Sequence, residues 1–138
     1  MICYLDSSVL LRFLLAADDA IDPFTVGDEF IGSQLTRLEC RRTLHRLRLE
    51  NRLDDTGHAT LTSKLQLLLE SIDLVDISPG IVERAETNWG AILGSLDSLH
   101  LATALLYREN AKKPMRIATH DKALANAARI QQFEVTGI

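Results

Sequence analysis

Four acidic residues of this 138-residue chain lie among largely apolar neighbours. Asp6 follows the apolar run at 2–5, Asp97 stands at the head of the apolar segment 95–106, and Asp121 comes just after the strand-like segment 116–119. Glu39 lies in the middle of a long helical pattern. An ionised carboxylate in an apolar environment is costly unless it is paired, capped or bound to a metal ion.

The chemistry open to these residues depends on whether they meet. Several carboxylates in one cleft repel each other and raise each other's pKa, and a divalent cation removes that repulsion. Mg²⁺ and Mn²⁺ prefer carboxylate and water oxygens, and such an ion can turn water into a nucleophile and screen the charge of a phosphodiester. Taken singly, each aspartate could instead cap a helix. Glu39 could pair with Arg42 or Thr43 on an exposed helix face.

The elements that position these residues alternate between strands and helices. Hydrophobic periodicity predicts strands at 2–5, 30–33, 73–77, 116–119 and 133–137. It predicts helices at 7–17, 34–52, 55–71, 79–92, 95–106 and 120–130, with Ser95 as the N-cap of the fifth. This alternation predicts an α/β fold with a mostly parallel sheet. Functional groups in open parallel sheets gather beyond the carboxyl ends of the strands, which is where Asp6 and Asp121 fall and toward which Asp97 could point.

Length and composition narrow the class of protein. A chain of this length is predicted to form a single domain over residues 1–138. The formal net charge of −4 argues against a general nucleic-acid binder, so any such role needs local positive charge. The two cysteines, Cys3 and Cys40, suit a reducing compartment. No basic leader and no apolar stretch of membrane-spanning length is visible, so we expect a cytoplasmic protein without membrane association.

Local positive charge is found in the segment 36–52, which holds six arginines against two glutamates. The arginines are Arg37, Arg41, Arg42, Arg46, Arg48 and Arg52. They could grip RNA phosphates close to Glu39, form a solvated helix face, or meet the acidic loop at 18–29; the sequence leaves these interpretations open. His45 and His100 are candidates for acid–base chemistry, although His100 lies in an apolar helix and is interpreted as a packed, hydrogen-bonded core residue.

The order and settings of the four acids resemble those of PIN-domain nucleases, and the chain is similar to VapC-type toxin ribonucleases of type II toxin–antitoxin systems. The resemblance covers nearly the whole length. Its segments are "YLDSSVLL", "SQLTRLECRRTL", "LDSLHLATA" and "ATHDKALANAA", of which "LDSLHLATA" is the most specific. The resemblance implies a three-layer α/β/α sandwich and a metal-dependent endoribonuclease that uses Mg²⁺ or Mn²⁺.

By this resemblance, Asp6, Glu39, Asp97 and Asp121 are the catalytic, metal-binding acids. Asp6 and Asp97 would contact the ion most directly, and Asp121 would act through water or a second ion. Ser8 and Thr119 match hydroxyls that support these acids, although plain capping explains them equally well. The chain departs from the family pattern at Ser7, where threonine is common. It also lacks the basic residue that often precedes the third aspartate, which puts substrate contacts at that edge in doubt.

The resemblance also implies partners: an RNA substrate, a cognate antitoxin whose tail occupies the cleft, and a second copy in a homodimer. The alternative of a different class is a catalytically inactive PIN-like module that binds RNA or protein. A phospho-accepting receiver domain would need a pair of acids after the first strand, and a haloacid-dehalogenase-type phosphatase would need an acid at position 8, where this chain has Ser8.

Overall fold

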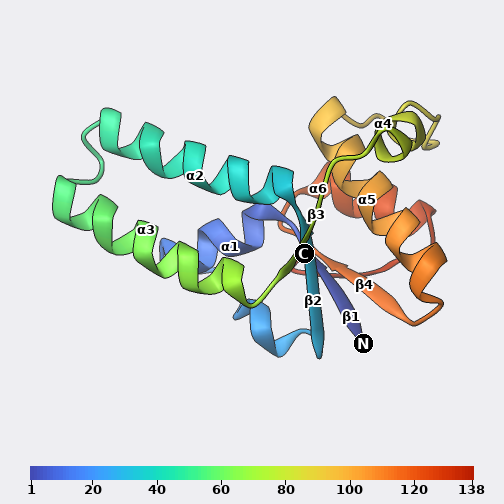
Figure 1. The fold of residues 1–138 in the computed structure, drawn as a ribbon, viewed down its shortest axis with the longest axis horizontal. Coiled ribbons are helices and arrows are strands. Elements are labelled where there is room, and N and C mark those ends of the chain that lie inside the picture. Colours follow the sequence, from blue (N-terminus) through green and yellow to red (C-terminus); the bar gives the residue numbers. More distant parts are fainter.

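The computed structural model describes residues 1–138 and contains a five-stranded sheet with helices on both faces (Figure 1). The strands are β1 (Ile2–Leu5), β2 (Glu29–Ser33), β3 (Asp73–Val75), β4 (Met115–Ala118) and β5 (Glu134–Thr136). The helices are α1 (Ser7–Leu14), α2 (Gln34–Leu49), α3 (Asp55–Glu70), α4 (Pro79–Ala85), α5 (Ser95–Ala111) and α6 (Lys122–Ile130), with a 3₁₀ turn at Pro23–Thr25. No helix is both long and apolar enough to cross a membrane.

The sheet has the order β3-β2-β1-β4-β5, and all four pairings are parallel. The predicted α/β class and parallel sheet are therefore confirmed. The chain moves outward from β1 in one direction through β2 and β3, and later in the other through β4 and β5. The point where the order reverses lies beside β1, and such a switch point is the usual place for a ligand in an open parallel sheet.

Strand β1 forms the centre of the molecule because all four of its residues are apolar and all four are buried. A strand covered on both faces reads as a continuous apolar run, as this one does. Successive side chains point to opposite faces of the sheet. Ile2 and Tyr4 accordingly belong to one core cluster, whereas Cys3 and Leu5 belong to the other.

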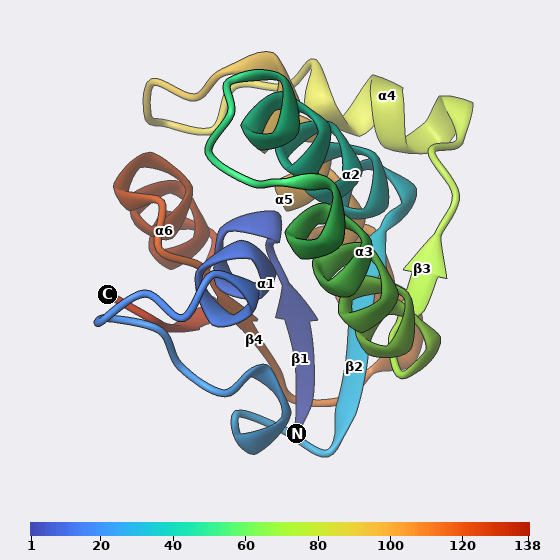
Figure 2. The same ribbon diagram turned by 90° about the vertical axis from the view of Figure 1, so that its left-hand side faces the viewer.

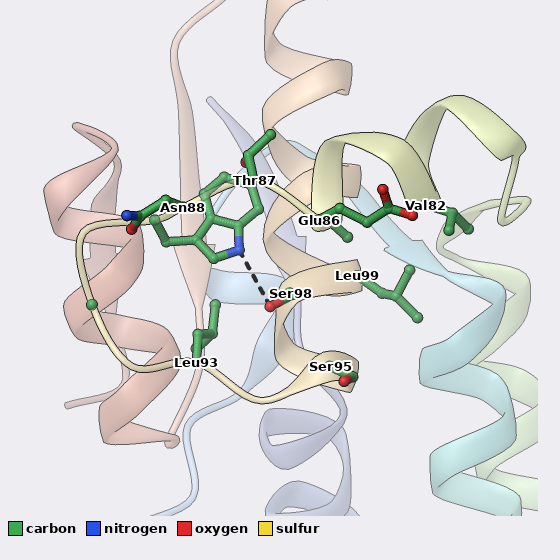
Figure 3. A pocket seen from close by; sticks show the side chains of 11 residues that line it. Val82, Glu86, Thr87, Asn88, Leu93, Ser95, Ser98 and Leu99 are labelled. Carbon is green, nitrogen blue, oxygen red and sulfur yellow. Dashed lines mark hydrogen bonds between the residues drawn. The ribbon is translucent and has the colours of Figure 1, made fainter.

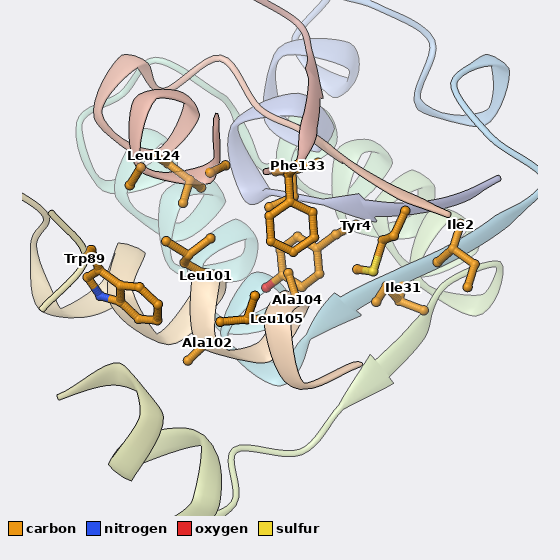
Figure 4. Close-up of a cluster of buried hydrophobic side chains, with 14 of the residues drawn as sticks. Ile2, Tyr4, Ile31, Trp89, Leu101, Ala102, Ala104, Leu105, Leu124 and Phe133 are labelled. Carbon is orange, nitrogen blue, oxygen red and sulfur yellow. The ribbon is translucent and has the colours of Figure 1, made fainter. Parts of the chain in front are cut away.

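The two core clusters define the three layers of the sandwich. One face of the sheet is covered by α1, α2 and α3, which lie in front of the strands in Figure 2. The opposite face is covered by α4, α5 and α6, and Figure 4 shows the side chains of this cluster, among them Trp89, Leu101, Leu124 and Phe133. Layers of this kind confirm the predicted α/β/α architecture.

Several predicted elements are shorter in the structure, and the helix predicted at 79–92 is the largest error. Helix α4 ends at Ala85, and residues 86–94 form a loop. Gly90 has a positive φ of 75°, and the Asn88 side chain accepts a hydrogen bond from its N–H group at 2.9 Å. The loop turns Trp89 into the core, where it is 5% exposed. Burial of this indole outweighs the local preference for helix.

Smaller differences concern helix ends. The first helix was predicted to reach residue 17 but ends at Leu14, and Ala16 adopts a positive φ of 52°. The helix predicted at 34–52 ends at Leu49, with Asn51 at a φ of 57°. Ser95 was predicted as an N-cap, but Gly94 is the cap and Ser95 is the first helical residue. Each of these ends lies in a polar or exposed segment, where the hydrophobic pattern carries little information.

Candidate metal centre

Asp6 lies at the junction of β1 and α1, at the centre of the carboxyl edge of the sheet, and is 4% exposed. Its backbone occupies the N-cap position of α1, yet its side chain makes no capping hydrogen bond. Instead its Oδ2 atom accepts hydrogen bonds from the Ser8 hydroxyl at 2.7 Å and from the Thr119 hydroxyl at 2.8 Å. Plain capping therefore does not explain this carboxylate.

The two hydroxyls are themselves held by the backbone. Ser8 Oγ accepts the His120 N–H group at 2.9 Å, and Thr119 Oγ1 accepts the Asp121 N–H group at 3.0 Å. Accepting these bonds leaves the hydroxyl protons to point at Asp6. The segment that follows β4 thus fixes one carboxylate oxygen of Asp6. The residues predicted as supporting hydroxyls, Ser8 and Thr119, both contact the first acid.

Glu39 reaches the same place from the second turn of α2. Its side chain is 26% exposed, and its Oε1 atom lies 2.6 Å from Nε2 of His100 on α5. The interpretation of Glu39 as a partner of Arg42 or Thr43 is wrong, because the carboxylate points toward α5 instead. Nε2 of His100 also lies 3.6 Å from Oδ1 of Asp6. One imidazole nitrogen therefore faces two of the predicted acids.

Asp97 lies in the first turn of α5 and is half-buried. Burial raises the pKa of its carboxyl from 3.8 to about 6. The negative charges of three further carboxylates also raise this pKa, whereas the charge of His100 opposes them. The three are Asp121, Asp6 and Glu39. All four predicted acids are therefore close enough to interact, and we call them the acid cluster.

Asp121 is the N-cap of α6, and its Oδ1 atom accepts the Leu124 N–H group at 2.8 Å. The capping role considered for this residue is thus present in the structure. Its charge nevertheless ranks first among those that raise the pKa of Asp97. A carboxylate has two oxygens, so one can cap the helix while the other remains free for a ligand.

His100 is the residue of this region that the sequence analysis assigned only to the core. It is completely buried, as expected, but both of its ring nitrogens bond to other side chains. The spacing of Asp97 and His100 could have indicated its position, since residues three apart lie on one face of a helix. One ligand atom each from Asp6, Glu39 and His100 lie within 4.8 Å of one another.

A cavity of about 490 Å³ lies between α4, the loop 86–94 and the first turn of α5 (Figure 3). Ser95 and Ser98 of α5 line it, together with Glu86 and Trp89. The indole N–H of Trp89 donates a hydrogen bond to the Ser98 hydroxyl at 3.2 Å. Asp97 lies between the two serines in the chain, so the first turn of α5 contributes to both the acid cluster and this cavity.

The arginines of α2 are only partly free. Arg48 pairs with Asp55 at 2.6 Å, Arg41 donates a hydrogen bond to Gln66 at 2.7 Å, and both Arg46 and Arg52 lie within 4 Å of Glu50. Arg37 and Arg42 are exposed and have no acidic partner. None of the six meets the acidic loop at 18–29. Glu39, Arg42 and Arg46 follow at helical spacing along one face of α2.

The acid cluster suits a divalent cation, because its carboxylates repel one another when no ion lies between them. Carboxylate oxygens are the donors that Mg²⁺ and Mn²⁺ prefer. The pKa of Asp97 rises chiefly because the carboxyl is partly buried and further because other carboxylates lie near it, and a cation would oppose both effects. No ring of cysteines or histidines competes for a softer metal, since Cys3 and Cys40 are buried in the core between sheet and helices.

The family model described as "PIN domain" matches residues 3–130. Among curated proteins, Ribonuclease VapC47 of Mycobacterium tuberculosis (strain CDC 1551 / Oshkosh) is 26% identical over 133 residues, which cover 91% of this chain and 89% of that protein.

Two solved structures resemble the fold over almost their full length. VapBC2 from Rickettsia felis, bound to a DNA fragment from its promoter, has a TM-score of 0.66 at 16% identity, with 99% of this chain and 98% of the other covered. FitAcB from Neisseria gonorrhoeae has a TM-score of 0.64 at 20% identity, with 98% and 96% covered. At these identities the two likenesses show the fold alone.

Proposed function

Because this chain belongs to the PIN domain family, we propose that it is a metal-dependent endoribonuclease that cleaves RNA phosphodiester bonds. The observation that carries the proposal is the approach of Asp6 and Glu39 at the switch point of a parallel sheet, where the charges of Asp6, Glu39 and Asp121 also raise the pKa of Asp97. The name of the curated relative, a ribonuclease, supports RNA as the substrate class.

In this proposal Asp6 and Asp97 hold the cation, with Glu39 and Asp121 completing its surroundings. A bound Mg²⁺ or Mn²⁺ supplies activation of water and screening of the charge that builds up on the phosphodiester. The protein's own residues prepare the place. The two hydroxyls on Asp6 keep its Oδ2 atom fixed, which leaves Oδ1, 3.6 Å from Nε2 of His100, for the cation. The backbone that holds those hydroxyls also leads directly into Asp121.

Arg42 and Arg46 provide the positive charge that an RNA strand requires. They continue the face of α2 on which Glu39 lies, and Arg42 has no acidic partner. Arginine donates in a fork geometry that matches phosphate, so these side chains can hold the strand on one side of the reacting phosphodiester. An acidic protein with such local charge binds RNA at this face rather than over its whole surface.

We further propose that the chain acts as the toxin of a toxin–antitoxin pair in the cytoplasm. The likeness to the VapBC2 and FitAcB structures and to a VapC ribonuclease supports an antitoxin partner, and a homodimer stays a prediction from family resemblance. The two buried, free cysteines fit a reducing compartment.

The decisive experiment measures cleavage of a mixed RNA pool with Mg²⁺ or Mn²⁺ and after addition of EDTA. We expect cleavage that EDTA stops and that fresh Mn²⁺ restores. Asp6→Asn should abolish it while circular dichroism shows an intact fold, and Asp18→Asn, which alters an exposed acid in a loop, should leave the rate unchanged. Full activity in folded Asp6→Asn would refute the assignment. RNA binding without turnover under every metal would favour the inactive binding module instead.

A further inference from the structure

A chain of hydrogen-bonded side chains runs from Tyr4 on β1 through His100 on α5 and ends on Glu39 of α2. His100 on α5 is completely buried, with Nε2 2.6 Å from Oε1 of Glu39 and Nδ1 2.5 Å from the hydroxyl of Tyr4. Tyr4 is also completely buried, and its hydroxyl has His100 as its hydrogen-bond partner.

The bond to Glu39 decides what His100 can do. A carboxylate only accepts hydrogen bonds, so Nε2 of His100 carries the proton of that bond whether the ring is neutral or cationic. A protonated ring nitrogen has no lone pair for a metal ion. His100 therefore differs from Asp6 and Glu39, although the three offer atoms within 4.8 Å of one another.

The other side of the ring explains why this arrangement is stable. Tyr4 engages Nδ1 from the central strand, and the two rings meet edge to face with centroids 5.8 Å apart. With both nitrogens engaged, the imidazole has a single orientation. Glu39, in contrast, has a long side chain that is 26% exposed, and fixing such a side chain costs rotamer entropy. A rigid partner must therefore hold the Glu39 carboxylate in place if this carboxylate is to bind a metal ion.

We propose that His100 is a positioning residue for the metal centre: Tyr4 orients its ring, Nε2–H fixes the carboxylate of Glu39, and His100 does not itself bind the cation. This inference rests on the proposed metal-dependent function. A purely structural role, in which Tyr4 and His100 only satisfy each other inside the core, makes different predictions for metal binding.

The first test asks whether a nitrogen coordinates the ion. Wild-type protein is loaded with Mn²⁺, and pulsed electron paramagnetic resonance is used to look for the coupling of a directly coordinated ¹⁴N nucleus. We expect none. A coordinated nitrogen that disappears in His100→Gln would overturn the inference, because it would make His100 a ligand.

The second test asks whether Tyr4 influences an ion that it cannot reach. The dissociation constant for Mn²⁺ is measured without RNA for wild type, Tyr4→Phe, His100→Gln and His100→Ala. Partners behind metal ligands typically change affinity by about 10–100-fold, and we expect Tyr4→Phe and His100→Ala to weaken binding within this range. His100→Gln should weaken it less, because an amide N–H can still donate to Glu39. Tyr107→Phe makes the same chemical change on α5, away from the acid cluster, and should bind Mn²⁺ like wild type.

A double-mutant cycle separates positioning from general damage to the core. If His100 acts through the carboxylate, Tyr4→Phe should weaken Mn²⁺ binding in wild type but not in a Glu39→Gln background. Equal weakening in both backgrounds, or none in either, would overturn the proposal. If Tyr4→Phe fails to fold, the same cycle is run with His100→Gln. Absence of Mn²⁺ binding by the wild type would refute the proposed function together with this inference, whereas wild-type binding with unaffected variants would refute only the inference.

Discussion

Replacement of Asp97 by asparagine should stabilise the metal-free protein at neutral pH while it destroys the proposed metal site. The ionised carboxylate is unfavourable in the folded chain because it is half-buried beside three other acids. Asparagine has nearly the same shape and no charge, so the variant removes the repulsion without leaving a cavity. A residue that lowers the free energy of unfolding in the absence of its ligand is the expected cost of a functional site.

The magnitude follows from the pKa of Asp97. A rise from 3.8 to about 6 corresponds to at most about 3 kcal/mol, at about 1.4 kcal/mol for each tenfold change in proton affinity. Water and salt screen a half-buried group, so we expect a gain of about 1 to 1.5 kcal/mol. In a domain of this size that gain raises the melting temperature by about 3 to 6 °C.

The raised pKa of Asp97 also determines how the stability difference between variant and wild type changes with pH. The folded state holds the Asp97 proton more tightly than the unfolded state, so the penalty is absent below about pH 4 and grows as the pH rises through about 6. In thermal unfolding with EDTA, the melting temperature of Asp97→Asn should therefore be higher than that of wild type at pH 7.5 and equal to it at pH 4. Mn²⁺ should make the wild type the more stable protein at pH 7.5, since a ligand at 100 times its Kd adds about 2.7 kcal/mol to the free energy of unfolding.

The control is Asp18→Asn, which removes the same charge from an exposed loop position and should leave the melting temperature unchanged. An Asp97→Asn variant that melts below wild type in EDTA at pH 7.5 would refute the reasoning. So would a gain of equal size at pH 4 and pH 7.5, because it could not come from ionisation of the carboxylate.

Three further predictions address the support of the site, the substrate and the core. Thr119→Val removes the hydroxyl that donates a hydrogen bond to Asp6. We expect the free energy of unfolding, measured by chemical denaturation, to fall by about 1–3 kcal/mol. We expect the Mn²⁺ affinity, measured by calorimetry, to be about 10–100-fold weaker. Arg42→Ala should weaken RNA binding and lower the slope of log K against log salt by about 0.7, whereas Arg48→Ala, whose side chain is already paired with an acid, should change the slope little. Leu65→Ala should cost about 2–5 kcal/mol of unfolding free energy because Leu65 is completely buried, whereas Leu67→Ala on the same helix should stay within about 0.5 kcal/mol, since Leu67 is 65% exposed. An equal effect of the two leucines would contradict the assigned core.

Much of the architecture could be predicted because the apolar pattern is local. Strand β1 is a continuous apolar run, and strands that alternate with helices leave few arrangements other than a parallel sheet. The loop 86–94 could not be predicted in the same way. Its residues can form helix, and what prevents it is the burial of Trp89 and its bond to Ser98, a contact that exists only after α5 has packed.

The acid cluster was partly accessible to sequence reasoning for a geometric reason. Strands β1 and β4 are parallel neighbours, so residues just beyond their ends, such as Asp6 and Thr119, must meet at one edge. Glu39 has no such relation to a strand end; it was grouped with the aspartates because of its apolar neighbours, and only the family resemblance gave it a role at the metal. The contact between Glu39 and His100 depends on how α2 and α5 approach each other across the sheet, which no spacing along the chain encodes.

The position of β1 at the middle of the sheet also governs when the molecule becomes complete during its synthesis. Asp6 is synthesised before Thr119, whose hydroxyl holds it and comes 113 positions later, together with the neighbouring strand β4. A nascent polypeptide, or a product truncated before Asp121, lacks one carboxylate and the covering helix α6. If the protein is the nuclease proposed above, a product truncated before Asp121 should not cleave RNA, because its metal site is incomplete.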